Sequence, residues 1–295
     1  MSVLIENQEI AIQGKLLRTA KLREEPYAIL EGPMGWLEKA RNAGIRADAF
    51  TFCQDLFEQE PKYGPVFELD SAALLSVSTY EHWWKKQLND KTRNMVRKAQ
   101  KSGVEVKFVT LTDDFVRGIC DIYNESPIIQ GKPNRFYGKS FEEIRQSLLS
   151  FPDRCDFIGA YHGAELIGFV KLVHGRNVSS LLHILSKTAH RDKAPTNALI
   201  AKAVEFCAER KIPFLHYGIW SRRGLGDFKK HHGFVRFDVP RYYIPLNWRG
   251  KLMLALKLHR RAIDWIPAGW QDRFVQLRNR WNSFKYRQPK QAMGR

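Results

Sequence analysis

The chain has 295 residues, of which 44% are hydrophobic and 12% aromatic, so it can bury a large core and does not belong to the disordered class. Its first residues lack the order of a signal peptide and no run reaches 18 apolar residues, so we expect a cytoplasmic protein with no membrane-spanning segment. The net charge of +17 points to partners that carry phosphates, either nucleic acid or anionic lipid headgroups, or serves solubility alone.

The four cysteines are far apart in the sequence and form no CxxC pair. This spacing does not fit a zinc site or a redox centre, so we expect reduced, partly buried thiols and no metal.

The first 77 residues predict an α/β portion. Residues 27–32 and 47–52 are apolar or alternating and predict strands, with a short helix over 35–44 between them. Residues 66–70, after a Tyr-Gly-Pro turn, predict a third strand.

Residues 78–103 predict one long connecting helix. Ser78 and Glu81 have the spacing of a capping box, and Gly103 can end the helix in a left-handed conformation. Trp84 and Leu88 begin an apolar stripe, whereas the other face is rich in lysine and arginine. That basic face either contacts water or binds phosphate.

Residues 104–248 alternate between short strands and helices. Thr112 starts a helix that Pro127 stops, and Ser140 with Glu143 forms a second capping box. Three antiparallel strands follow within 156–186, then a helix over 195–211 that begins with proline. The chain closes with a strand over 212–220, a short helix over 224–233 and a strand over 234–246, which we place at a sheet edge because Pro240 interrupts it.

This order of elements resembles the GNAT (N-acyltransferase) fold, and the finer motifs resemble its FemAB-like branch. The matching stretches are TRNMVRKAQKSGVEV, GAYHGAELIGFVKLV and LHYGIWSRRGLGDFKKHHGF, and the resemblance spans Val66 to Leu246. It implies a mixed α/β (α+β) architecture with a mostly antiparallel central sheet flanked by helices, preceded by residues 1–77 as a degenerate GNAT-like half and followed by a helical basic tail over 249–295.

The resemblance also implies an acyl donor, either acyl-CoA or aminoacyl-tRNA, as a co-substrate without a tightly bound cofactor. In GNAT enzymes the start of the helix after the fourth strand cradles the donor's pyrophosphate. Alanine or proline replaces the glycine of that loop here, and Pro195 removes an N–H donor, so CoA binding is an open question. The residues expected to line the donor site are Leu185, Ser186, Arg191, Lys193, Ala194, Thr196 and Asn197.

The family places a lysine near the acyl-transfer centre, and Lys229 is its match. A cation there would stabilise an oxyanion or orient a donor phosphate, although a lysine on a short helix can also simply face water. A base must take the proton of the attacking amine, and His216, Tyr217 and His183 are the candidates. Asp227 and Glu165 are further candidate bases, and a buried, hydrogen-bonded histidine remains the alternative at each histidine position.

His231 and His232 are neighbours on the predicted short helix and point in different directions. That divergence does not suit shared metal ligation.

The segment 249–295 carries much of the excess charge. From Arg241 to the end there are 13 basic and 2 acidic residues, a net +11. Two basic amphipathic helices are predicted, one with Leu252, Ala255, Leu256 and Ile263 on its apolar face and one with Trp270, Phe274, Leu277 and Trp281. Such a segment suits an anionic membrane surface, a nucleic acid or packing against the core, and tryptophans 248, 265 and 270 are typical of a membrane interface.

Two functions follow. The first is an acyltransferase in which an amine acceptor attacks an activated acyl or aminoacyl group directly. The alternative is a non-catalytic module of the same fold that docks on a membrane or nucleic acid through its basic tail.

Overall fold

The computed structural model describes residues 2–5, 8–22, 33–54, 56–57, 60–63, 67–129, 132–175, 177–221, 224–260 and 268–285. The strand predicted over 27–32 lies outside these residues. Within them, no helix combines the length and the apolar composition that crossing a bilayer requires.

The chain divides into two compact units. The first unit comprises residues 1–92, 173–182 and 204–260, and the second comprises 93–172, 183–203 and 261–295. The chain passes between the units within helix α3 (Asp90–Lys101), within strands β10 (Glu165–His174) and β11 (Val178–Ser186), within helix α6 (Pro195–Glu209) and after Arg260.

The first unit is built on a mostly antiparallel sheet with the strand order β1-β2-β3-β4-β13-β5-β12-β11. Only the pairs β3 with β4 and β11 with β12 are parallel. Its other strands are β1 (Ser2–Ile5), β2 (Gln8–Gln13), β3 (Thr19–Leu22), β4 (Ala49–Cys53), β5 (Phe67–Ser76), β12 (Phe214–Ile219) and β13 (Val235–Pro245).

The expectation that the strand containing Pro240 lies at an edge is wrong, because β13 pairs with β5 on one side and β4 on the other. The N–H and C=O of one strand residue point to the same neighbouring strand. The carbonyl of Pro240 accepts from the amide of Gln54, just beyond the end of β4. The missing N–H of proline therefore falls where the β4 ladder stops, so it costs no hydrogen bond within that ladder.

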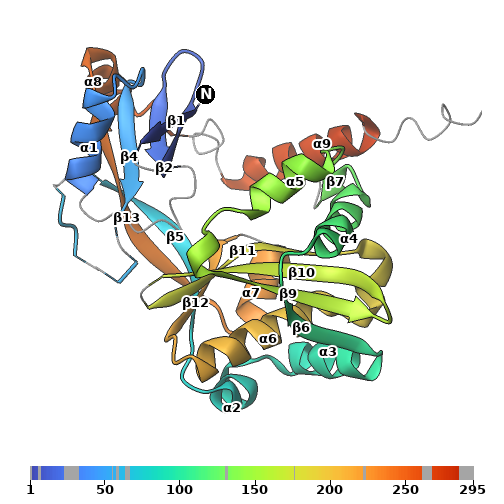
Figure 1. Cartoon of the computed structure of the whole chain (residues 1–295). Coiled ribbons are helices and arrows are strands. Elements are labelled where there is room, and N and C mark those ends of the chain that lie inside the picture. The colour runs from blue at the N-terminus through green and yellow to red at the C-terminus, as the bar shows by residue number, and fades with distance from the viewer. Residues whose placement is uncertain are drawn as a thin grey trace, which may run out of the picture. The chain divides into compact units, whose positions relative to one another are not determined.

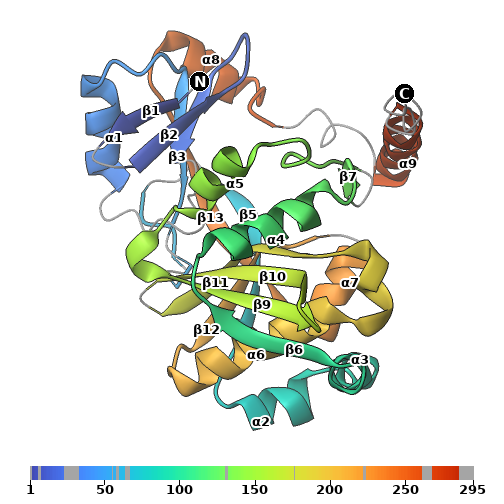
Figure 2. The same ribbon diagram turned by 45° about the vertical axis from the view of Figure 1, so that its right-hand side comes forward.

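An aromatic core fills this part of the first unit. Phe50, Phe52 and Tyr242 are at most 1% exposed, and the rings of Phe52 and Tyr242 stack with centroids 5.3 Å apart. Helices α1 (Pro33–Asn42) and α8 (Trp248–Ala255) lie beside strands β1, β2 and β4 in both views (Figures 1 and 2).

The long helix expected over 78–103 is interrupted. Helix α2 (Tyr80–His82) continues as a π-helical turn (Trp83–Gln87), Leu88 is extended, and α3 (Asp90–Lys101) begins afterwards. The N-cap is Thr79 and not Ser78, since the Thr79 hydroxyl accepts from the amide of His82. Asn89, after the interruption, donates its amide to the carbonyl of His231, so a tertiary hydrogen bond holds the chain where helix periodicity alone predicted continuity.

The second unit packs helices onto the strands β10-β9-β6, where β6 is Val104–Val109 and β9 is Cys155–His162. Helices α4 (Asp113–Asn124) and α5 (Phe141–Leu148) supply buried apolar residues to one core with Phe157 and Phe169. The predicted helix start near Thr112 is confirmed, and Thr112 is its N-cap because its side chain accepts from the amide of Phe115. The predicted capping box of Ser140 with Glu143 is also present. Short strands β7 (Ile128–Ile129) and β8 (Lys132–Pro133) and helix α9 (Ala268–Lys285) complete the described part of this unit.

Candidate functional site

An irregularity in β12 forms the centre of the candidate site in the first unit. The β12 strand pairs with β5 as far as His216↔Leu74, and the register then shifts before Ile219↔Ala72. Gly218 lies within this bulge with φ +60°, a left-handed conformation that glycine adopts without steric cost. At the bulge, backbone carbonyls of β12 leave the hydrogen-bond ladder of the sheet, so another group must donate hydrogen bonds to them.

Lys229, on helix α7 (Gly224–His231), supplies that group. Its Nζ donates to the carbonyls of Tyr217 and Ile219, both at 2.7 Å, and lies 4.6 Å from the centre of the Tyr217 ring. The residue is 3% exposed, which rules out the solvent-facing alternative, whereas Lys230 beside it is exposed. Burial lowers the pKa of Lys229 to about 8, from an ordinary value of 10.5.

His216 precedes the bulge and lies on the last of three parallel rungs, Ser180↔His216, that join β11 to β12. Its Nδ1 lies 3.2 Å from the Ser180 hydroxyl, and the residue is 3% exposed. Burial, with a smaller contribution from the charge of Lys229, lowers the pKa of His216 to about 4. The imidazole is therefore neutral at pH 7.

Tyr217 follows on the opposite face of β12. Burial raises the pKa of its phenol above the ordinary value, and its ring packs edge-on against Phe234. The phenol stays protonated at neutral pH, so Tyr217 acts as a hydrogen-bond donor more readily than as a base.

The C-terminal end of α7 is held by Trp83, a residue that was not predicted from the sequence. Trp83 is fully buried, and its indole N–H donates to the carbonyl of His232 at 2.8 Å. His232 is itself buried, with its Nδ1 2.8 Å from the carbonyl of Phe228, while His231 is exposed. The two histidines diverge as expected. Within the described residues, no group of three or more His, Cys, Asp or Glu side chains is arranged to hold a metal ion.

His183, the remaining candidate base, belongs to the second unit. Its Nδ1 lies 3.5 Å from the hydroxyl of Tyr123, and its ring lies edge-on to Phe136. Burial lowers the pKa of His183 to about 3, with further lowering from the charges of Arg135 and Lys171. This histidine is also neutral at pH 7.

The expected donor loop, also in the second unit, has a compact internal structure. Leu185 packs against the core of this unit, and the hydroxyls of Ser186 and Thr196 lie 2.7 Å apart. Ala194 adopts the left-handed conformation, with φ 54° and ψ 42°, at the position where the family has glycine. Pro195 then begins α6.

At least six backbone amides of residues 188–198 already have partners within the chain. Glu125, at the end of α4, accepts from the amides of Thr188 at 2.5 Å and Ala189 at 2.8 Å. The amides of residues 190, 194, 197 and 198 donate to backbone carbonyls of the loop. A carboxylate therefore occupies two amides of the kind that bind anions, and this contact across 63 residues could not be found from local sequence.

The charged residues of the loop face outward or form ion pairs. Arg191 is exposed, and Lys193 lies 3.3 Å from the carboxylate of Asp192. Glu165, a candidate base, pairs with Lys187 at 2.7 Å and with the His190 ring at 3.1 Å. The Lys187 bond is the largest favourable influence holding the pKa of Glu165 below its ordinary value, which makes it a poor base at neutral pH. Asp227, the other acidic candidate, lies in the first turn of α7.

Ala194→Gly is expected to stabilise the protein by about 1 kcal/mol, because a left-handed residue with a Cβ carries strain that glycine relieves. Urea denaturation followed by circular dichroism measures the change. Ala198→Gly, in the regular part of α6, is the matched control and should destabilise by about 1 kcal/mol. Equal destabilisation by both variants would show that the Ala194 conformation is not strained.

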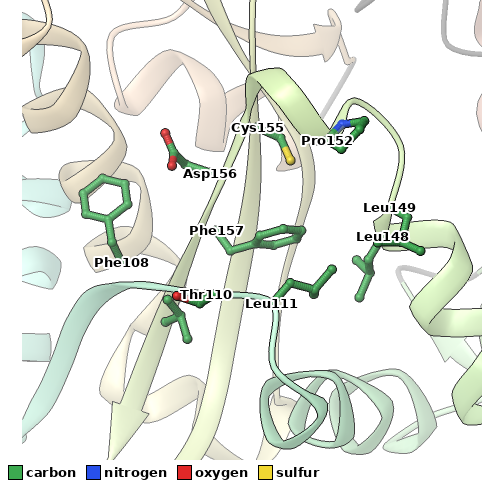
Figure 3. Close-up of a pocket in the computed structure, with 10 residues that line it drawn as sticks. Phe108, Thr110, Leu111, Leu148, Leu149, Pro152, Cys155, Asp156 and Phe157 are labelled. Atoms are coloured by element: carbon green, nitrogen blue, oxygen red, sulfur yellow. The ribbon is translucent and has the colours of Figure 1, made fainter.

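A cavity of about 480 Å³ lies in the second unit, at the end of β9 opposite to His162. The side chains of Leu111, Leu148 and Phe157 surround it, with Cys155 and Asp156 on the neighbouring part of β9 (Figure 3). None of the predicted site residues lines this cavity.

Comparison with known proteins finds a family model that matches the central region. Residues 86–230, just under half of the chain, match the model described as an acetyltransferase (GNAT) domain. This region is therefore similar to GNAT domains. No curated protein matches the chain.

Several solved structures share the fold of the chain over most of its length. The C-terminal domain of a putative lysylphosphatidylglycerol synthetase from Agrobacterium fabrum has a TM-score of 0.58 at 13% identity, over 86% of each chain. The L-PGS of Bacillus licheniformis has a TM-score of 0.53 at 12% identity, over 86% of this chain and 87% of the other. FemX has a TM-score of 0.54 at 11% identity, over 79% and 83%. The GNAT and FemAB-like resemblance is thus confirmed at the level of the fold.

Proposed function

We propose that the protein transfers an aminoacyl or acyl group from an activated donor to an amine acceptor, by direct attack and without a covalent enzyme intermediate. The observation that carries this proposal is the buried ammonium group of Lys229, held by two carbonyls at the β12 bulge, which begins after His216. A fixed cation and a neutral base are what aminolysis of an ester or thioester requires.

In the proposed reaction the amine nitrogen attacks the acyl carbon, an amide C–N bond forms, and the donor's C–O or C–S bond breaks. Two N–H groups of Lys229 serve the bulge carbonyls, and the third stabilises the oxyanion. His216 accepts the proton of the amine and returns it to the leaving group, so the charges balance. Tyr217 donates a hydrogen bond.

Aminoacyl-tRNA is the donor that we favour over acyl-CoA. The Glu125 carboxylate already occupies the amides of Thr188 and Ala189, the amides of residues 190, 194, 197 and 198 donate to backbone carbonyls, and Pro195 has no N–H, so a pyrophosphate cannot use these positions without displacing a partner. One structure of the same fold is named a putative lysylphosphatidylglycerol synthetase, and attachment of a lysyl group is aminoacyl transfer, which favours an aminoacyl donor. Arg191, Lys193 and the side chains of Leu185, Ser186, Thr196 and Asn197 then contact the acceptor end of the donor.

Equilibrium binding of the two donors tests this choice. The protein is expected to bind charged tRNA at least about tenfold more tightly than acetyl-CoA, and Glu125→Ala is expected to strengthen acetyl-CoA binding by freeing the amides of residues 188 and 189. Uncharged tRNA is the control for non-specific phosphate contacts, which weaken steeply with salt. Tighter binding of acetyl-CoA by the unmodified protein would overturn the choice of donor.

The competing function is a non-catalytic module that keeps the GNAT fold, and the internally satisfied donor loop favours it. It predicts that substitution of Lys229 or His216 leaves the cellular function intact, while removal of the residues after Arg249 abolishes it. Peripheral attachment to a membrane is compatible with both functions.

A further inference from the structure

An apolar stripe covers the outer side of helix α8 in the first unit. Trp248, Leu252 and Leu256 follow one another at intervals of four residues and are 72%, 51% and 52% exposed. At about 100° per residue this spacing places the three side chains on one face. Isolated exposed leucines are common on protein surfaces, but three large apolar side chains in one row are a feature that needs a partner.

The opposite face of α8 fixes the helix in this orientation. A Cβ atom on Gly250 would lie 1.8 Å from the carbonyl oxygen of Asp48, so the helix backbone touches the underlying segment directly. Met253, one turn later, is 1% exposed, and Asn247 caps the helix by accepting from the amide of Gly250. The helix cannot rotate its apolar stripe inward without breaking these contacts.

A second segment extends the apolar surface. Arg249 donates a hydrogen bond to the carbonyl of Leu16, which places the turn between β2 and β3 beside α8. Leu16 is 83% exposed, and Leu258, just beyond α8, is 48% exposed. We call Leu16, Trp248, Leu252, Leu256 and Leu258 the α8 surface.

Basic residues border this surface, and acidic ones are missing from it. Residues 248–260 contain four lysines or arginines and no aspartate or glutamate. Arg249 and Lys251 lie on the two sides of the stripe by helix geometry, and Lys251 and Lys257 are exposed. Asp48 lies 3.7 Å from Arg249 and Glu68 2.7 Å from Arg260, so each of these acids already has a basic partner.

We propose that the α8 surface docks on an anionic lipid bilayer. An apolar stripe with a tryptophan at its edge and lysine and arginine on both sides matches the depth profile of the interface, where aromatic groups lie at headgroup level and cations meet lipid phosphates. A nucleic acid would satisfy the cations but leave the leucines in water. The sequence alone left an anionic membrane, a nucleic acid and packing against the core open for the segment 249–295, whereas this proposal places membrane contact on one face of α8 together with Leu16. The inference does not depend on the proposed catalysis.

Cosedimentation of the full chain with vesicles tests the proposal. Binding is expected to vesicles of phosphatidylcholine with 30% phosphatidylglycerol, and at least about tenfold weaker binding to pure phosphatidylcholine. Leu252→Glu should reduce binding to the anionic vesicles about tenfold or more, because it places a carboxylate within the apolar stripe. Leu69→Glu is the matched control, since Leu69 is 60% exposed on β5 and lies outside the α8 surface.

Three results would overturn the inference: no binding to anionic vesicles, equal loss in both leucine variants, or self-association in solution that Leu252→Glu abolishes. The last result, seen by sedimentation velocity, would assign the surface to a second copy of the chain. Lys251→Ala with Lys257→Ala should weaken binding to anionic vesicles while leaving the melting temperature unchanged, which separates lipid contact from folding.

Discussion

Lys229→Met is expected to lower the transfer rate per folded molecule by about 100- to 1,000-fold. Removal of one donor to a developing oxyanion costs about 3 to 4 kcal/mol of transition-state stabilisation. The substitution also leaves the carbonyls of Tyr217 and Ile219 without their donor, so the protein should lose about 1 to 3 kcal/mol of stability as well. Rates must therefore be measured well below the melting temperature of the variant, with the folded fraction determined in the same sample.

Lys230→Met is the matched control, because Lys230 is the exposed neighbour of Lys229 on the same helix. It should keep both the rate and the stability of the unmodified protein. If Lys229→Met lowers only stability and leaves the rate per folded molecule unchanged, Lys229 holds the bulge together and has no catalytic role.

The pH dependence separates these roles further. With a folded-state pKa of about 8, Lys229 loses its proton, and the site its cation, as the pH rises through 8, so the rate should fall there. In the unfolded chain the pKa of Lys229 has its ordinary value of 10.5, so between pH 8 and 10.5 the unfolded state binds a proton that the folded state has lost. The contribution of Lys229 to the free energy of unfolding therefore becomes more favourable as the pH rises from 8 to 10.5. A rate that falls while this contribution rises cannot come from unfolding.

Trp83→Ala is expected to destabilise the protein by about 3 to 5 kcal/mol, the cost of removing a fully buried aromatic side chain. The indole also donates to the carbonyl of His232, at the end of the helix that carries Lys229. Trp83→Phe, which keeps most of the ring, should cost about 1 to 3 kcal/mol, because it removes the indole hydrogen bond and leaves a small gap in the packing. Urea denaturation followed by circular dichroism gives both values.

Trp84→Ala is the control for that prediction. Trp84 is adjacent but only half-buried and stacks on Tyr80, so its removal should cost about 1 kcal/mol. Equal costs for the two tryptophans would contradict the packing described here.

Local signals predicted the second half of the fold well. The capping box at Ser140, the N-cap at Thr112 and the proline that begins α6 are read from residues within a few positions of one another, and all three are present. The strands β1, β2 and β3 were missed, because they are short and their pairing carries little local pattern. The central position of the strand with Pro240 depends on two partners distant in sequence, which local rules do not supply.

The candidate site shows the same division. The turn and short helix that bear Lys229 follow from glycine spacing, so the helix over 224–233 was predicted. The burial of Lys229 depends on the β12 bulge, and the occupation of the loop amides depends on Glu125, 63 residues away. Trp83 was missed because regular helical periodicity places Trp84 on the buried face. The π-helical turn and the break at Leu88 place Trp83 there instead.

Formation of an amide product tests the proposed transfer most directly. The protein is incubated with a panel of amines and either charged tRNA or acetyl-CoA, and N-acylated products are detected by mass spectrometry. We expect an amide from charged tRNA with the unmodified protein and with Lys230→Met, and a yield about 100-fold lower or less with Lys229→Met. An amide yield from Lys229→Met equal to that of Lys230→Met, or donor consumption through a covalent acyl-protein, would contradict direct attack assisted by Lys229.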